Sequence, residues 1–421
     1  MPPNLSPNPT RSPGSHLLQR SLALFANFFL IILAYYQVKA ASRSLLIEFG
    51  GAGSFPYAWV YSAVVLTALI GFYHRIVARY SRARVVLGSL LLFAAALIGF
   101  RLLLGQKNMF AALSFYIFVD IFSVVLVEQF WSLTNSITDT EEGRKSYWFV
   151  GTGGLVGGVA GGVLASYLVE HTPLATADLL YTCAVLLLVT FALNVTMWRA
   201  GMYREVSVKT VAPAVTPDWR GLVANRYVLL IAAIVCLSQL AQPIIEFQFI
   251  SSIERAGMAL DRRTAFIAEF FSIMGLVSIG VNIVFTPLIH RYIGIFAGLA
   301  VQPLLISLCS FGFFLHTSLL NASVMKAADR GLSYSINRAS KELLYIPVDP
   351  VQTYQAKAWI DMLGYRVFKV LGSGLILVAT QWLPVRLDIG ELSFITFVIC
   401  AVWLLTIAAL SRSYGRLVAA S

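Results

Sequence analysis

The chain of 421 residues is 58% hydrophobic and only 12% charged, whereas a soluble domain is roughly 45–50% apolar and about 25% charged. This composition, with a mean hydropathy of +0.77, excludes an ordinary soluble domain and indicates a polytopic membrane protein. The net charge of +11 could suggest nucleic-acid binding. Because the basic residues gather in short segments between apolar runs, we assign them to membrane topology and expect no nucleic-acid partner.

Apolar runs of about 20 residues, the length that an α-helix needs to cross the hydrocarbon core, recur along the whole chain. They predict an all-α polytopic protein with twelve transmembrane helices. No stretch shows the repeated alternation of a membrane β-barrel. The expected helix centres lie near residues 31, 65, 95, 122, 160, 188, 240, 277, 305, 332, 370 and 401.

The polar segments divide the chain into two halves. Residues 1–20 are rich in Pro, Ser and Asn and predict a disordered cytoplasmic tail, not a cleaved signal peptide. A central cytoplasmic loop at 199–226 separates six-helix halves at 21–198 and 227–411, and a second tail follows at 412–421. Two such halves are typical of the major facilitator superfamily, in which substrate binds near the midplane.

The orientation follows from the loop charges. Most Lys and Arg residues outside the spans fall on the side of both termini, including Arg75, Arg79, Arg82 and Arg84 between the second and third spans. Since cytoplasmic loops carry an excess of Lys and Arg, we expect both termini in the cytoplasm and the protein in the cell inner membrane. We also expect a monomer surrounded by membrane lipids.

Polar and charged residues interrupt the apolar pattern on the first, fourth, seventh and tenth predicted helices. These helices line the central cavity of the major facilitator architecture, and on each of them the polar residues share one face. We therefore predict a substrate-binding surface formed by Lys39, Arg43, Trp131, Asn135, Arg330, Tyr334, Asn337, Lys341 and Tyr345. Alternatively, such charges pair to fix helix register, as Asp329 with Arg330 or Lys341 with Glu342 would.

Three carboxylates lie on the same helix faces: Asp120, Glu128 and Glu246. We expect them to offset the positive charge of an empty cavity. One of them could carry a coupling proton, because burial and a neighbouring like charge both favour the neutral form of a carboxyl group. Glu128 is the first choice, since it shares a helix face with Asp120.

The run GTGGLVGGVAGG at residues 151–162 lacks the Gly-Lys-Ser/Thr ending of a phosphate-binding loop and follows no predicted strand. Its period of four instead places glycines on one stripe of the fifth helix, where another helix can approach closely. We expect a packing surface, which could also slide during transport. No catalytic or metal-ligand spacing occurs, so we expect no enzyme, cofactor or metal, and the four Cys residues within apolar runs predict buried side chains.

Two segments carry a more specific pattern. The first contains Phe130, Trp131, Asn135, Ile137, Thr138, Glu142, Arg144, Lys145 and Tyr147, followed by the glycine-rich helix. The second contains Lys341, Glu342, Tyr345, Ile346, Pro347, Asp349, Lys357, Ala358, Ile360, Asp361, Gly364, Arg366, Lys369 and Gly372. The first resembles the helix 4 to helix 5 region of the nucleotide transporter (ATP/ADP translocase) family of plastids and intracellular bacteria. The second resembles that family's helix 10 to helix 11 signature, with the residues in the same order. By this resemblance, Lys341 and Glu246 would be functional positions.

The chain also departs from that family. Ser136 replaces an acidic residue, Ile250 replaces a Lys, and Lys39 and Arg43 lack the accompanying Asp. The resemblance therefore implies the fold and leaves the substrate open. We predict a secondary active transporter of an organic anion, either a nucleotide or another phosphorylated metabolite, that works by alternating access with a coupling proton or counter-substrate. The alternatives are a flippase or transporter of an anionic lipid or siderophore-like amphiphile, and a non-transporting scaffold or sensor.

Overall fold

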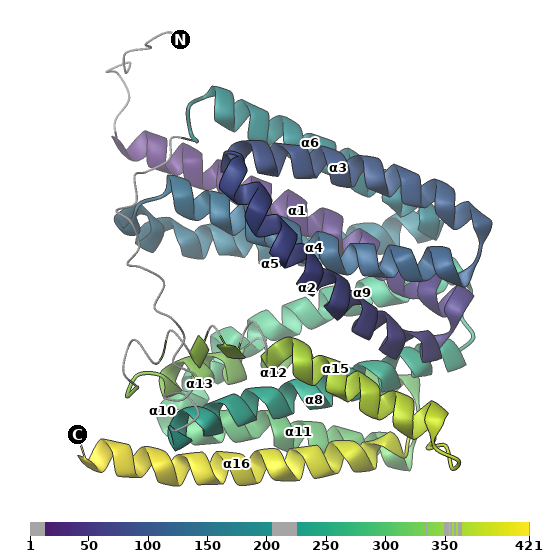
Figure 1. Ribbon diagram of the computed structural model, residues 1–421, viewed down its shortest axis with the longest axis vertical. Coiled ribbons are helices and arrows are strands. Elements are labelled where there is room, and N and C mark those ends of the chain that lie inside the picture. The colour runs from purple at the N-terminus through teal and green to yellow at the C-terminus, as the bar shows by residue number, and fades with distance from the viewer. Residues whose placement is uncertain are drawn as a thin grey trace.

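The computed structural model describes residues 13–203, 225–333, 335–348, 353, 356–357, 359–360 and 364–420. These residues are almost entirely helical, and they form two bundles stacked against each other (Figure 1). The N-terminal half comprises α1 (Pro13–Gly50), α2 (Phe55–Arg79), α3 (Arg82–Leu103), α4 (Met109–Ile137), α5 (Thr140–His171) and α6 (Leu179–Arg199). The C-terminal half comprises α8 (Arg226–Arg255), α9 (Leu260–Gly280), η4 (Val281–Phe285), α10 (Thr286–Tyr292), α11 (Ile295–Leu315), α12 (Leu319–Ser333), α13 (Ile336–Leu344), α15 (Tyr365–Leu377), η6 (Val378–Trp382) and α16 (Leu392–Ala420).

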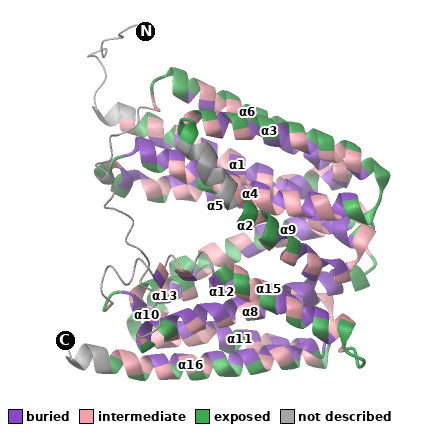
Figure 2. Ribbon diagram, viewed as in Figure 1, coloured by how far each residue is buried: buried purple, intermediate pink, exposed green. Residues whose placement is uncertain are grey.

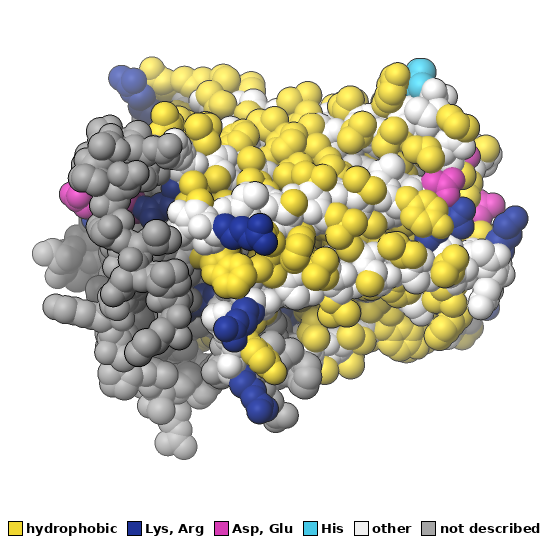
Figure 3. All heavy atoms as spheres, turned by 90° about the horizontal axis from the view of Figure 1, so that it is seen from above, with side chains coloured by type: hydrophobic (Ala, Val, Ile, Leu, Met, Phe, Trp, Pro, Cys, Tyr) yellow, Lys and Arg dark blue, Asp and Glu magenta, His cyan; other side chains and the backbone are white. Residues whose placement is uncertain are grey.

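The prediction of an all-α membrane protein with twelve helices is confirmed. Among the described residues, ten helical stretches are long and apolar enough to cross a membrane. The tenth and eleventh predicted spans are not among these ten stretches. The tenth divides into α12 and α13, and the eleventh consists of the 13-residue α15 followed directly by the π-helical η6. On the face shown in Figure 3, hydrophobic side chains cover the middle and charged ones lie mainly toward the two ends.

Both ends of the described chain lie at one end of the molecule. α1 begins there at Pro13, inside the segment expected to be a tail, and α16 ends there at Ala420 (Figure 1). Most of the expected central loop lies outside the described residues. We call the end at which α1 begins and α16 ends the terminus side, and the other end the opposite side.

The glycine-rich stripe of α5 packs directly on α1. A Cβ atom added at Gly153, Gly157 or Gly161 would lie 2.5–2.6 Å from a main-chain oxygen of α1. A main-chain oxygen cannot move aside as a flexible side chain can, so only glycine permits this approach. The predicted packing surface is therefore confirmed, and α1 is its partner. Buried residues accordingly gather where helices face one another, as Figure 2 shows.

Polar contacts join the two halves on the opposite side. The main-chain N–H of Ala52 donates a hydrogen bond to Glu254 at 3.1 Å, and Gln381 donates to the Gly53 carbonyl at 3.0 Å. Arg263 forms an ion pair with Glu48 at 2.5 Å. Deeper in the bundle, α5 packs against α9 and α2 against α15. These contacts close the interface between the halves on the opposite side.

Candidate functional site

A cavity of about 600 Å³ lies between the two halves. Its walls come from the middle of α2, α4 and α8, and from α12, α13 and α15. In the described part of the chain, its charged lining consists of five basic residues and two acidic ones: Arg330, Arg338, Lys341, Arg366, Lys369, Asp120 and Glu342. The cavity thus has an excess of positive charge and is positioned for an anionic ligand.

The break in the tenth span brings both of its parts to the cavity wall. Ser335, which precedes α13, has φ −117° and ψ −99°, a conformation outside the α-helical region. Arg330 and Ser333 therefore line the cavity from the end of α12, whereas Asn337 and Lys341 line it from α13. Interrupted helices of this kind commonly form the binding sites of transporters.

A smaller hollow of about 40 Å³ adjoins the cavity. The two spaces share Trp59, Asp120, Gln242, Arg330 and Lys369 as lining residues. The hollow is additionally lined by Arg43 and Tyr116 from the N-terminal half, and by Pro243 and Glu246 from the C-terminal half. It is therefore an inner extension of the cavity at the boundary between the halves.

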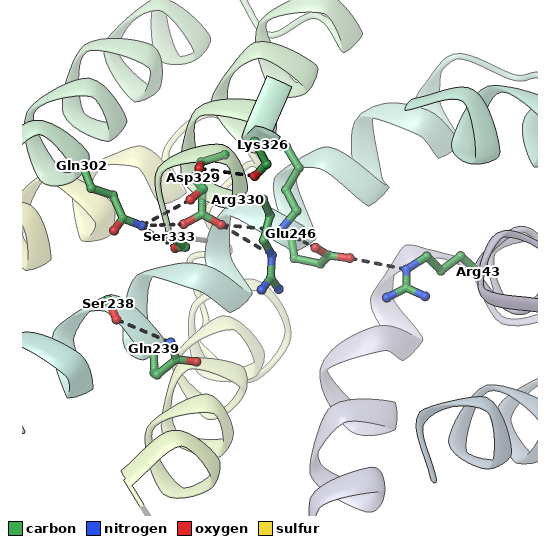
Figure 4. Close-up of polar contacts among 11 residues, drawn as sticks. Arg43, Ser238, Gln239, Glu246, Gln302, Lys326, Asp329, Arg330 and Ser333 are labelled. Carbon is green, nitrogen blue, oxygen red and sulfur yellow. Dashed lines mark hydrogen bonds and ion pairs between the residues drawn. The ribbon is translucent and has the colours of Figure 1, made fainter. Parts of the chain in front are cut away.

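A network of buried charges lies beside this hollow (Figure 4). Glu246 on α8 forms an ion pair with Lys326 on α12, and its second oxygen lies 3.6 Å from Nε of Arg43 on α1. Lys326 lies 3.7 Å from Asp329, which also accepts a hydrogen bond from Gln302 at 3.2 Å. Because isolated charges are costly within a membrane, pairing of this kind is what makes them tolerable.

Several predicted residues come together at these spaces. Of those that the structure describes, Asp120, Arg330, Asn337 and Lys341 line the cavity, and Arg43 and Glu246 line the hollow. Tyr334 lies outside the described residues. The expected register pair of Asp329 and Arg330 is present at 3.9 Å, and Glu342 forms an ion pair with Lys357.

Lys39 lies outside both spaces. Its ammonium group is 4.0 Å from the ring centre of Phe271 on α9 and 4.4 Å from that of Tyr36. A cation is attracted to the face of an aromatic ring, so these rings hold Lys39 at the contact between α1 and α9.

Four other predicted residues also lie away from the cavity lining. Glu128 is exposed on α4, and Asn135 accepts a hydrogen bond at 2.8 Å from the Tyr147 hydroxyl. Trp131 packs edge-on against neighbouring aromatic rings, one of them Tyr147. Tyr345 is buried beneath the ammonium group of Lys357, at 4.8 Å.

Residues that were not predicted as binding positions complete the basic lining: Arg338, Arg366 and Lys369. Trp59 on α2 also lines both spaces. One signal was available, because Arg366 and Lys369 are two cations spaced i, i+3 in an otherwise apolar segment. No comparable signal marks Trp59, since a Trp in an apolar helix usually packs against lipid or core.

Sequence comparison identifies the family. Residues 92–328 and 322–414 match the TLC ATP/ADP transporter family. The chain belongs to this family. One relative, ADP,ATP carrier protein 1 of Chlamydia trachomatis serovar D, is 23% identical over 474 residues that cover 95% of this chain and 89% of the relative. ADP,ATP carrier protein 1 of Rickettsia bellii is 20% identical, with 72% of this chain and 69% of the relative covered.

Solved structures show the same fold. A mutant form of the nucleoside transporter NupG superposes with a TM-score of 0.67 at 15% identity, covering 93% of this chain and 99% of that structure. A bacterial homologue of the iron transporter ferroportin, in an inward-facing state, gives 0.65 at 14% identity and covers 94% and 98%. These neighbours are transporters of the major facilitator type. This member of the TLC family is thus a multi-pass membrane transporter and not an enzyme.

Proposed function

We propose that this TLC family member transports an organic anion, either a nucleotide or another phosphorylated metabolite, through the central cavity. The observation that carries the proposal is the excess of basic residues, five against two acidic ones among the described lining. Fixed cations attract an anion more strongly in a partly desolvated site than in water. The volume of about 600 Å³ is also within the usual range of roughly 300–1,000 Å³ for small-molecule sites.

The lining suggests a role for each part of the site. Lys341 on α13 and Lys369 on α15 would contact the anionic group, and Arg338 and Arg366 on the same two helices would attract it into the cavity. Trp59 and Tyr365, which line the cavity, offer aromatic faces for a ring. The ADP,ATP carrier names of the relatives favour a nucleotide within this substrate class.

We further propose that the terminus side faces the cytoplasm of a cell whose inner membrane holds the protein. The cavity is then accessible from inside, while the contacts of Glu254, Arg263 and Gln381 close the outer side. Alternating access would require these contacts to break as the terminus side closes. Asp120, which lines both the cavity and the hollow, is better placed than the exposed Glu128 to carry a coupling proton.

The test is a thermal-shift screen of the purified full-length protein, followed by uptake into proteoliposomes. ATP, ADP, glucose 6-phosphate and pyrophosphate should raise the Tm, and adenosine should not. Lys341→Gln and Lys369→Gln should each weaken anion binding about tenfold, since a hydrogen bond to a charged group contributes roughly 1.5–3 kcal/mol. Lys145→Gln is the matched control, because Lys145 is exposed and lies outside the lining.

Other outcomes would support other functions. Stabilisation by neutral or cationic ligands alone would overturn the proposal. Transport of anionic lipid without any soluble anion would select the flippase alternative. Absence of transport, together with cavity variants that leave cellular function intact, would select a scaffold or sensor.

A further inference from the structure

Arg43 is an incompletely satisfied cation at the inner end of the site. It is the one basic residue that the described N-terminal half contributes to the hollow. Its Nε atom is buried and has no hydrogen-bond partner within the described residues, and the 3.6 Å separation from Glu246 is too long for a hydrogen bond. One terminal nitrogen donates to the Lys39 carbonyl at 3.2 Å. Arg43 therefore retains capacity for another acceptor.

Glu246, by contrast, is already neutralised within its own half. It forms an ion pair with Lys326, whose side chain is only 1% exposed. Lys326 and Arg330 together balance Glu246 and Asp329, so this network of the C-terminal half needs no charge from α1. In Figure 4, Arg43 approaches this network from a separate helix. Arg43 can therefore exchange Glu246 for another anion without leaving Glu246 unpaired.

We propose that Arg43 is the inner anchor for the anionic group of the substrate, and that Lys326 is a positioning residue that prevents Glu246 from capturing Arg43. This inference rests on the proposed function. The hollow of about 40 Å³ compares with the roughly 10–15 Å³ that holds one water molecule on the same measure. It therefore admits the anionic end of a substrate whose remainder occupies the larger cavity.

The arrangement links binding to conformational change. Arg43 and Glu246 lie on helices of different halves, between the cavity and the contacts that close the opposite side. An anion that binds Arg43 lengthens the contact between Arg43 and Glu246, and so weakens the interaction between α1 and α8. Glu246 remains paired with Lys326, so no uncompensated carboxylate is left behind.

The experiment uses the anion with the largest thermal shift among ATP, ADP, glucose 6-phosphate and pyrophosphate, and measures its Kd by calorimetry on the full chain. Lys326→Met should weaken binding about tenfold although Lys326 lines neither space, because an unpaired Glu246 then holds Arg43. The double variant Lys326→Met/Glu246→Gln should recover affinity to within about threefold of wild type. Arg43→Gln should lose affinity, and Glu246→Gln should not rescue it.

Glu246→Gln alone keeps the inference falsifiable if Lys326→Met does not fold. It should bind the anion at least as tightly as wild type, because Arg43 is released. Weakened binding by Glu246→Gln, or unchanged binding by Lys326→Met, would overturn the inference while leaving the proposed function intact. Absence of anion binding by the wild-type protein would overturn the proposed function, and this inference with it.

Discussion

The carboxylate of Glu254, at the end of α8, accepts a hydrogen bond from the main chain of Ala52 in the other half of the molecule. The residue before Ala52 is Gly51, whose φ of +70° lies in the left-handed region. A Cβ atom at this position would also lie 3.0 Å from Oε1 of Glu254. One closing contact of the opposite side therefore depends on a glycine conformation.

Gly51→Ala should lower the Tm, because φ 70° with ψ 167° is a conformation that essentially only glycine adopts and that costs other residues roughly 1–3 kcal/mol, and because the added methyl group crowds Glu254. Gly53→Ala is the control in the same turn. Gly53 does not have a positive φ, and its added Cβ would meet only Gln381, at an ordinary 3.4 Å. Equal Tm values for the two variants in thermal unfolding would contradict the role assigned to Gly51.

Gly157→Ala tests the contact between α5 and α1. A Cβ there would lie 2.5 Å from the Phe29 carbonyl oxygen, so the helices must separate, and overpacking of this kind costs about 1–3 kcal/mol. Gly151→Ala lies on the same helix with nothing within 4 Å of its Cβ. It should be neutral or stabilising by up to about 1 kcal/mol, since Ala favours a helix more than Gly does. Thermal unfolding of both variants in one detergent separates packing from helix propensity, and similar Tm values would argue against close packing.

Asp120→Asn should tighten anion binding several-fold. Asp120 lines both the cavity and the hollow, so removing its charge removes a repulsion from the site. Glu128→Gln makes the same change of charge on the same helix at an exposed position, and it should alter neither the Kd nor the pH dependence of uptake. A larger effect from Glu128 than from Asp120 would restore Glu128 as the proton-coupling candidate.

Asp388 lies between η6 and α16, outside the membrane spans. A hydrogen bond from Arg255, at 2.5 Å, lowers the pKa of this carboxyl group. A lowered folded-state pKa contributes stability above the unfolded value of about 3.9, and that stability is lost as the pH falls through the folded-state pKa. Both side chains are more than half exposed (53% and 56%), so the pair contributes only about 0.2–1 kcal/mol.

The Tm difference between wild type and Asp388→Asn should therefore be constant from pH 7 to about pH 5 and shrink as the pH falls below about 4. In an Arg255→Gln background, the Asp388→Asn substitution should have a smaller effect between pH 5 and pH 7, where Asp388 is ionised. A Tm difference that grows on acidification would show that the ionised Asp388 does not stabilise the folded protein through this ion pair.

Much of the fold was predictable because each span must satisfy its main-chain hydrogen bonds internally, and so leaves a long apolar run in the sequence. The break between α12 and α13 was not predicted. A charged segment with continuous helical periodicity gives no sign of a local departure at Ser335. The glycine stripe of α5 was predictable because its period matches the helical repeat, although its partner α1 was not.

The site was predicted in part. Helical periodicity placed Arg330, Asn337 and Lys341 on one face of the predicted tenth helix, and all three line the cavity. The side chains of Lys39 and Trp131 are also on polar or aromatic helix faces, but these faces meet α9 and neighbouring rings. The sequence of a single helix does not show which other helix packs on each of its faces, because this depends on how the two halves pack together.

The interruption of the tenth span separates two tasks along one stretch of chain. α12 carries Lys326 and Asp329, whose pairing must remain balanced, whereas α13 carries Asn337, Arg338 and Lys341 on the cavity wall. Because the helix is not continuous, substitutions in α13 need not disturb the charge balance of α12. A short segment such as α13, which can change in sequence on its own, would let transporters of one fold bind different substrates with few compensating substitutions elsewhere.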